Sequence, residues 1–127
     1  MSLKENEISA FVLDRCIHIH NELGPGLFES VYEHALCYEL AKHDFYFERQ
    51  KGIPVVYEGT NLELGFVADI IVENKVIIEI KSIDAIAPVH FKQVLTYLRL
   101  TDCKLGSLIN FNTEKVKDGF HRIVNNL

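Results

Sequence analysis

The stretch from residue 62 to residue 81, LELGFVADIIVENKVIIEIK, predicts two β-strands joined by a tight turn. The predicted strands are Leu62 to Val72 and Val76 to Ile80, with Glu73-Asn74-Lys75 as the connection. Asparagine tolerates the left-handed backbone conformation that tight turns need. The apolar residues of the second strand do not alternate with polar ones, which is typical of a central strand covered on both faces. The stretch therefore predicts a hairpin at the centre of a sheet.

Charged side chains interrupt the apolar run of this hairpin. Glu79 and Lys81 are two residues apart, so they project from one face of a strand, where a buried charge is costly unless it is paired or bound to metal. A loop symmetric about Asn74 places Asp69 opposite Glu79, with Cβ atoms about 4.5 to 5.5 Å apart, so both carboxylates reach one ion. A one-residue change of register would move Asp69 to the other face. The spacing therefore predicts a site formed by Asp69, Glu79 and Lys81.

The residue types at this site indicate its chemistry. Carboxylates without a cysteine cluster nearby suit a hard cation such as Mg²⁺ or Mn²⁺. In the hydrolysis of a phosphodiester, that ion would polarise the scissile phosphate and lower the pKa of a bound water. Lys81 would orient the water or neutralise the developing negative charge. The alternative is a structural ion pair between Asp69 and Lys81, with Glu79 partly exposed at the end of the sheet.

The rest of the chain predicts helices around these strands. Apolar residues at helical spacing indicate helices, and aromatic and β-branched runs between turn residues indicate strands. The predicted elements are helices Ile8–Leu23 and Leu27–His43, strands Phe45–Gln50 and Ile53–Tyr57 with a break at Lys51-Gly52, the central hairpin, a helix from Pro88 to about Leu100, and strands Leu105–Phe111 and Phe120–Val124. This order predicts an α/β fold in which a mixed sheet is flanked by helices, in one domain spanning residues 1–127.

Composition and charge limit the classes of function. A chain of 127 residues that is 48% hydrophobic buries the core of one domain. Its apolar runs are too short to span a bilayer and its N-terminus is too polar for a signal peptide, so we expect a cytoplasmic location and no membrane partner. Three scattered cysteines without a CxxC pair predict neither disulfides nor a cysteine zinc site.

The net charge of −5 argues against a protein that coats nucleic acid nonspecifically. Residues 1–74 carry five Lys and Arg against thirteen Asp and Glu (5 − 13 = −8), and residues 75–127 carry eight against five (8 − 5 = +3). The second half is therefore able to face a polyanion, although chance scatter of solvated charges gives the same counts.

Several motifs, in order along the chain, resemble one known family. They are Gly26-Leu27-Phe28-Glu29-Ser30-Val31-Tyr32, then Ala68-Asp69 with Glu79-Ile80-Lys81, then His90, Gln93, Tyr97 and Leu98, and finally Leu108-Ile109-Asn110-Phe111. The first has the form GxxExxY, and the second has the form of the PD-(D/E)xK nuclease signature. Over nearly its whole length, the chain thus resembles the small bacterial proteins of the GxxExxY family, within the PD-(D/E)xK superfamily of restriction-endonuclease-like nucleases.

The resemblance implies a restriction-endonuclease-like αβββαβ core and a third acidic ligand. Glu29, from the early helix, would join Asp69 and Glu79 around the metal. The plainer interpretation of Glu29 is a favourable charge in the first turn of a helix, where acidic residues are common.

The resemblance also implies that Gln93 and Tyr97 border the same cleft. Gln93 is expected among the catalytic residues, while Tyr32 and Tyr97 are expected to be secondary. Their plainer interpretations are a glutamine that holds a strand edge, and core or boundary tyrosines whose hydroxyls are hydrogen-bonded.

The chain departs from the family pattern at two positions. Ala68 replaces the nominal proline, which many members also lack. Val67 stands two places before Asp69, where related proteins often have arginine, so contact with the substrate phosphate is put in doubt. The cationic residues that would substitute are left open as Arg49, Lys51, Lys92 and Arg99.

The leading hypothesis is a Mg²⁺-dependent nuclease that acts on DNA, with RNA left open as the alternative substrate. Its ligands would be Asp69, Glu79 and Glu29, with Lys81 positioning the attacking water. One alternative is a catalytically weak or inactive nucleic-acid-binding or protein-binding module that keeps the fold, and another is a metal-dependent hydrolase of a smaller phosphodiester. Many proteins of this fold act as dimers, so a homodimer is also left open.

Overall fold

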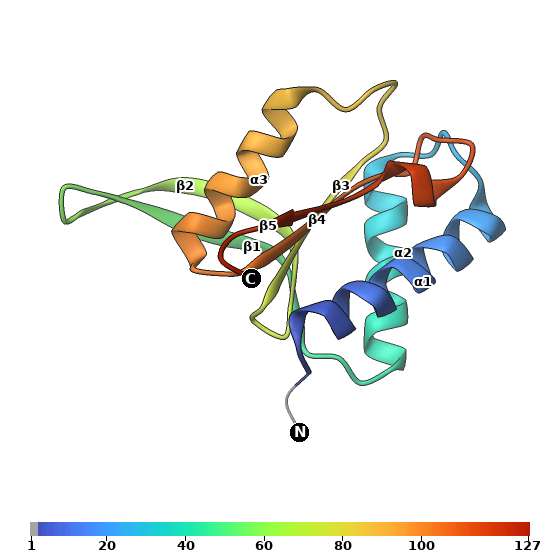
Figure 1. Ribbon diagram of the computed structural model, residues 1–127, viewed down its shortest axis with the longest axis horizontal. Helices are drawn as coiled ribbons and strands as arrows, with labels where there is room; N and C mark the ends of the chain where they lie inside the picture. Colours follow the sequence, from blue (N-terminus) through green and yellow to red (C-terminus); the bar gives the residue numbers. More distant parts are fainter. Residues whose placement is uncertain (1–2) are drawn as a thin grey trace.

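A mixed five-stranded sheet with helices on both faces forms the protein (Figure 1). The structure is a computed structural model that describes residues 3–127, apart from the side chain of Leu64. The elements are α1 (Glu5–Leu23), α2 (Glu29–Lys42), β1 (Phe47–Tyr57), β2 (Thr60–Val72), β3 (Val76–Lys81), α3 (Pro88–Thr101), β4 (Leu105–Asn110), the short 3₁₀ helix η1 (Val116–Gly119) and β5 (Phe120–Val124). The strands lie in the order β1-β2-β3-β4-β5, and only β3 and β4 are parallel among them. The predicted α/β fold class is confirmed, and α2-β1-β2-β3-α3-β4 follows the αβββαβ order.

The central hairpin has the predicted register. Val72 pairs with Val76, and Ile70 pairs with Ile78, so the loop is symmetric about Asn74. Glu73 and Asn74 both adopt left-handed backbone conformations, with φ of 54° and 56°. The pairing of β2 with β3 covers only Ile70–Val72 of β2. Beyond that point the two strands separate, and β2 continues as the partner of β1 alone.

The predicted break at Lys51-Gly52 is wrong, because β1 is continuous from Phe47 to Tyr57. Lys51 and Gly52 pair with Ala68 and Val67 of β2, so long-range strand pairing overrides the local turn preference of glycine. The irregularity lies instead between Pro54 and Val56, where the register shifts.

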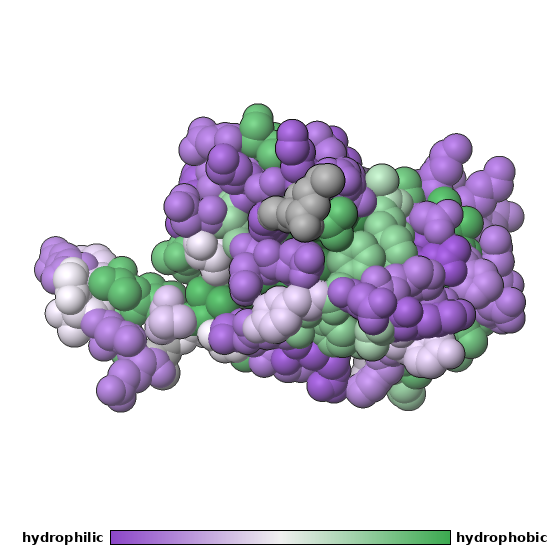
Figure 2. Space-filling view, turned by 90° about the horizontal axis from the view of Figure 1, so that it is seen from below, coloured by the Kyte–Doolittle hydropathy of each residue, from purple (hydrophilic) through white to green (hydrophobic). Residues whose placement is uncertain are grey.

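The outer part of β1 and β2 forms an arm that projects from the body of the molecule (Figure 1). The arm lies at the left in Figure 2, where apolar residues reach the surface between polar ones. Its exposed large apolar side chains are Val56, Tyr57, Leu62 and Val67.

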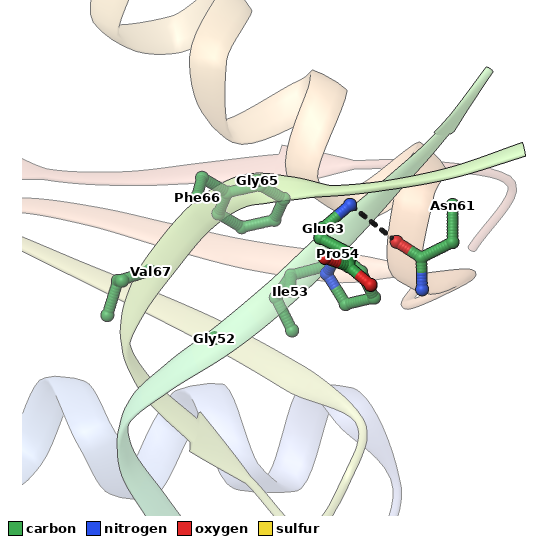
Figure 3. Close-up of a pocket in the computed structure, with 8 residues that line it drawn as sticks. All are labelled: Gly52, Ile53, Pro54, Asn61, Glu63, Gly65, Phe66 and Val67. Atoms are coloured by element: carbon green, nitrogen blue, oxygen red, sulfur yellow. Dashed lines mark hydrogen bonds between the residues drawn. The ribbon is translucent and has the colours of Figure 1, made fainter.

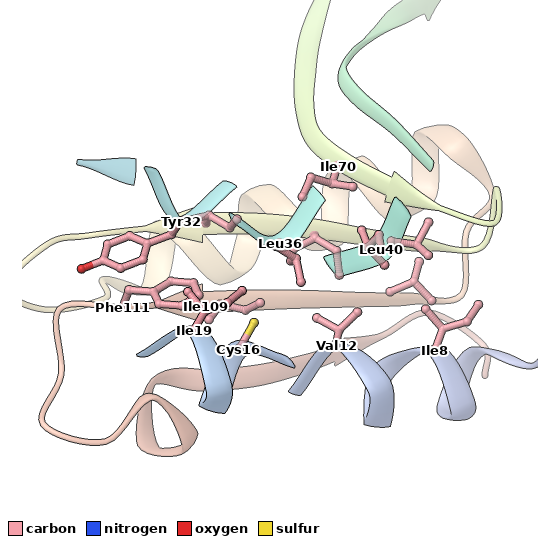
Figure 4. Packing of buried hydrophobic residues seen from close by; sticks show 14 of the residues in the cluster. Ile8, Val12, Cys16, Ile19, Tyr32, Leu36, Leu40, Ile70, Ile109 and Phe111 are labelled. Atoms are coloured by element: carbon pink, nitrogen blue, oxygen red, sulfur yellow. The ribbon is translucent and has the colours of Figure 1, made fainter. Parts of the chain in front are cut away.

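Two hydrophobic cores, one on each face of the sheet, explain why β3 is apolar without alternation. Ile78 and Ile80 pack into the core under α1 and α2, whereas Ile77 packs into the core under α3. Figure 4 shows the first core, with Val12 of α1 and Leu36 of α2 among its members. Both sets of side chains are buried because helices cover both faces. Alternation along the strand therefore places Glu79 with Ile77, on the side of α3.

No helix in the part of the chain that the structure describes is long and apolar enough to cross a membrane.

Candidate active site

Asp69 and Glu79 meet where β2 and β3 separate. The backbone N–H of Asp69 donates to Oε1 of Glu79 at 3.3 Å, and the backbone N–H of Ile80 donates to Oδ2 of Asp69 at 2.8 Å. Each carboxylate therefore binds the backbone of the strand opposite its own. This crossed pair of hydrogen bonds holds the two carboxylates side by side, as the hairpin symmetry predicts.

The surroundings of Glu79 disfavour its charged form. Glu79 is only 7% exposed, and its pKa is raised to about 8. Burial is the largest cause of this rise and the negative charge of Asp69 is the second, while the Asp69 backbone N–H and the charge of Lys81 oppose it. Burial beside Asp69 therefore favours the protonated form of Glu79.

Lys81 lies half-buried at the end of β3, two residues beyond Glu79 on the same face. Its backbone carbonyl accepts a hydrogen bond from the N–H of Phe111, which fixes the end of the strand. Among residues 3–127, no ion pair joins the ammonium group of Lys81 to a carboxylate. The alternative of a structural Asp69–Lys81 ion pair with a partly exposed Glu79 is therefore wrong.

Glu29 lies at the start of α2, and its carboxylate contacts Ser82, the residue that follows β3. Its Oε2 accepts a hydrogen bond from the backbone N–H of Ser82 at 3.0 Å, just beyond Lys81. The structure therefore places Glu29 beside the C-terminal end of β3, where its hydrogen-bond partner is Ser82 rather than the backbone that binds the Asp69–Glu79 pair.

Glu33, one helical turn after Glu29, is the α2 carboxylate that approaches Asp69. Gln50 bridges the two, since its amide donates to Glu33 Oε1 at 2.6 Å and to Asp69 Oδ1 at 3.3 Å. Burial raises the pKa of Glu33, the Gln50 hydrogen bond opposes this, and the charge of Asp69 adds to it. Sequence reasoning missed both Glu33 and Gln50. The available signal was the spacing of four residues between Glu29 and Glu33, which puts them on one helical face.

Arg49 is the cationic residue that the structure brings to this cluster. Its Nε lies 2.9 Å from Oε2 of Glu33, so it stands beside the acidic group that Gln50 links to Asp69. Lys51 is paired with Glu48 at 2.7 Å instead. Of these two residues, Arg49 is therefore the one beside the acidic cluster.

The two predicted site residues of α3, Tyr97 and Gln93, differ in their contacts. Tyr97 stacks on Phe66 with ring centroids 3.5 Å apart. Burial raises the pKa of Tyr97, and the charges of Glu79 and then Asp69 raise it further, so its hydroxyl lies within their electrostatic reach. Gln93 is exposed, and within the described residues its side chain makes no hydrogen bond.

Tyr32 has a structural position. Its hydroxyl donates to the carbonyl of Gly24 at 2.7 Å and accepts from the N–H of Leu27 at 3.1 Å. Its ring stacks on Phe111 in the core, with centroids 4.3 Å apart (Figure 4). Tyr32 thus fastens the loop before α2, as the plainer interpretation has it.

A family model described as the PD-(D/E)XK nuclease superfamily matches residues 6–123. The chain belongs to the PD-(D/E)XK nuclease superfamily. No curated protein and no solved structure matches the chain significantly. The superfamily indicates a nuclease-like phosphodiesterase with nucleic acid as its substrate, and its members generally use divalent metal ions. The narrower GxxExxY family and a bacterial source remain predictions from the motifs.

The acidic pair of this superfamily member fits a hard divalent cation. Among residues 3–127, no three His, Cys, Asp or Glu side chains gather in an arrangement that could hold a metal ion. Two carboxylates suffice for Mg²⁺, which commonly keeps several waters and takes one or two protein carboxylates plus substrate phosphates. Burial beside Asp69 disfavours the charged form of Glu79, and a cation bound between the two carboxylates would favour that charged form. The donor set therefore suits Mg²⁺ or Mn²⁺.

The arm of this superfamily member contains a separate hollow (Figure 3). Gly52, Ile53, Gly65 and Phe66 are among its lining residues, and Glu63 is the titratable residue among them. None of the predicted site residues lines it. Phe66 connects the arm to the site, because its ring stacks on Tyr97.

Proposed function

We propose that the protein is a divalent-metal-dependent nuclease that acts on DNA, with RNA as the alternative substrate. Asp69 and Glu79 would hold Mg²⁺ or Mn²⁺, and Lys81 would position the attacking water. The observation that carries the proposal is the crossed hydrogen bonding of Asp69 and Glu79, which holds two carboxylates side by side in a member of a nuclease superfamily. The homodimer and the cytoplasmic location remain predictions.

The acidic pair and Lys81 would have separate roles in the reaction. A cation bound at the pair would polarise the scissile phosphate and lower the pKa of a bound water. The backbone N–H of Ile80 and the amide of Gln50 fix both oxygens of Asp69, so this carboxylate is oriented before substrate binds. Lys81 lies on the same face as Glu79, and its ammonium group would hold the water or stabilise the charge that develops on the phosphate oxygens.

The test is cleavage of plasmid, single-stranded DNA and RNA in Mg²⁺ and in Mn²⁺. We expect cleavage that EDTA stops and that Lys81→Ala reduces at least tenfold, since one positioned proton-transfer or charge-stabilising group contributes about 10²- to 10⁴-fold. The matched control is Lys104→Ala. Lys104 immediately precedes β4, whose parallel pairing with β3 puts it at the opposite end of the sheet from Lys81. Cleavage that persists in Lys81→Ala, or that is absent from the native chain on all three substrates, contradicts the proposal.

The exposed Val67 supports a second candidate, a nucleic-acid-binding or protein-binding module that keeps the fold. Val67 is half exposed and offers no charge to a phosphate two residues from Asp69. Calorimetry separates the two functions. Mg²⁺ or Mn²⁺ binding that is lost in Asp69→Asn supports the nuclease, whereas nucleic-acid affinity that is unchanged by EDTA and by Asp69→Asn supports the module. Hydrolysis of an aryl phosphodiester without cleavage of polymers would instead indicate a smaller substrate.

A further inference from the structure

Phe28 is 84% exposed, more than any other large apolar side chain that the structure describes. It lies on the rim of a cavity of about 590 Å³ whose other lining residues are Gly26, Leu27, Glu29, Ser30, Ser82 and Asn112. Three segments meet there: the start of α2, the loop after β3 and the loop after β4, at the upper right of Figure 1. A large ring with this exposure at a cavity rim indicates a contact surface for a ligand.

The stability of the fold does not explain a phenylalanine at this position. Phe28 is the N-cap of α2, where Ser, Thr, Asp and Asn are preferred because their side chains accept a hydrogen bond from the first turn. Phe28 supplies no such bond. Among residues 3–127, no aromatic ring stacks on it. The side chain gains little from folding, and departures from local preference of this kind concentrate at functional sites.

Two hydrogen bonds fasten this rim to the candidate active site. The hydroxyl of Ser82 donates to the carbonyl of Leu27 at 2.7 Å, and the N–H of Ser82 donates to Glu29 at 3.0 Å. Ser82 directly follows Lys81. Three residues of extended chain separate Glu79 from Ser82, which is about 10 Å. That distance equals about three stacked nucleotides at about 3.4 Å each.

The chemistry of the cavity favours a neutral, flat group over a phosphate. Glu29 places a carboxylate at the rim, and no lysine, arginine or histidine is among the described lining residues. Ser30, Ser82 and Asn112 offer hydroxyl and amide groups to the edge of a base. Aromatic side chains beside such groups are the usual platform for unpaired bases, since every base presents a π-face.

We propose that Phe28 is a positioning residue that stacks on an unpaired nucleobase of the substrate, a few nucleotides from the scissile phosphate. The substrate class is then single-stranded nucleic acid, or a single-stranded branch of a duplex. This inference rests on the proposed nuclease function.

The test measures binding in the Lys81→Ala background, in Mg²⁺, to a short single-stranded oligonucleotide that carries a fluorescent adenine analogue. We expect Phe28→Ala to raise the Kd about fivefold or more, the effect of losing one base–aromatic stack, and to abolish the quenching of the analogue. Phe28→Trp retains both signals. Phe28→Ser weakens binding like Phe28→Ala yet raises the midpoint of thermal unfolding, because serine is a preferred N-cap. The matched control is Tyr38→Ala, an exposed aromatic of α2 that does not line this cavity.

An oligonucleotide that lacks one base distinguishes stacking from general affinity. The protein with Phe28 should bind the abasic oligonucleotide more weakly than the intact one, and the Phe28→Ala protein should bind both equally. Three results would each overturn the inference. They are equal Kd values of the native chain and Phe28→Ala for the intact strand, equal Kd values of the native chain for the intact and abasic strands, and no binding of single strands at all. Cleavage by the native chain with an unchanged Kd in Phe28→Ala removes the stacking role alone. Stacking without cleavage by the native chain removes the nuclease proposal alone.

Discussion

Glu79→Gln tests the electrostatics of the acidic pair without any substrate. Burial, and secondarily Asp69, raises the pKa of Glu79 from 4.5 to about 8 in the folded chain. Between these two pH values the folded protein keeps a proton that the unfolded chain has released, so the free energy of unfolding falls as pH rises. Below pH 4.5 both states hold the proton and no loss occurs. At about 1.4 kcal/mol per pH unit, the loss across the window reaches at most about 5 kcal/mol.

Urea unfolding in EDTA, at pH 4.5 and at pH 8, measures this loss. Glutamine keeps the shape of Glu79 and removes its titration, so the native chain should lose at least about 2 kcal/mol more than Glu79→Gln between the two pH values. Glu114→Gln, at an exposed carboxylate in the loop after β4, is the control and should follow the native curve. Parallel pH dependence of the native chain and Glu79→Gln would refute the placement of Glu79 as a buried carboxylate beside Asp69.

Three further outcomes follow from particular contacts. Asp69→Asn should abolish the thermal stabilisation that Mn²⁺ gives the native chain, as measured by calorimetry, because one of two ligand carboxylates is lost. Arg49→Ala should lower the free energy of unfolding by about 1 kcal/mol, since Arg49 is partly exposed, and Glu33→Gln in the same chain should restore part of that loss in urea unfolding. Gly106→Ala should lower the free energy of unfolding by about 1 to 3 kcal/mol, because the added Cβ would lie 2.7 Å from Cγ1 of Val94. Val94→Ala should relieve this clash. A double variant that is less stable than the sum of the two single effects would contradict the packing.

The hairpin could be predicted from sequence because its determinants are local. Asn74 marks the turn, and the residues on each side of it fix which pairs face each other. The prediction at Lys51-Gly52 failed because the pairing partner of those residues lies in β2, and local turn signals carry no information about it.

Which of the two α2 carboxylates, Glu29 or Glu33, approaches Asp69 could not be predicted from the sequence. The two residues lie on one face of α2, so helical spacing fits either. Which of them reaches Asp69 depends on how far α2 slides along the sheet, and that position is set by the packing of buried residues such as Leu36 and Leu40 against the sheet. The Ser82 hydrogen bond that occupies Glu29 also comes from a distant loop.

The point where β2 leaves β3 explains why the fold produces this site. Strand pairing that ends at Ile70 leaves the backbone N–H groups of Asp69 and Ile80 without partners in the other strand, and buried N–H groups of this kind are costly unless they are satisfied. The carboxylates of Glu79 and Asp69 accept these two hydrogen bonds. Both N–H groups are satisfied because the acidic side chains turn toward the gap, so the same separation that frees the β1–β2 arm also orients the two carboxylates toward each other.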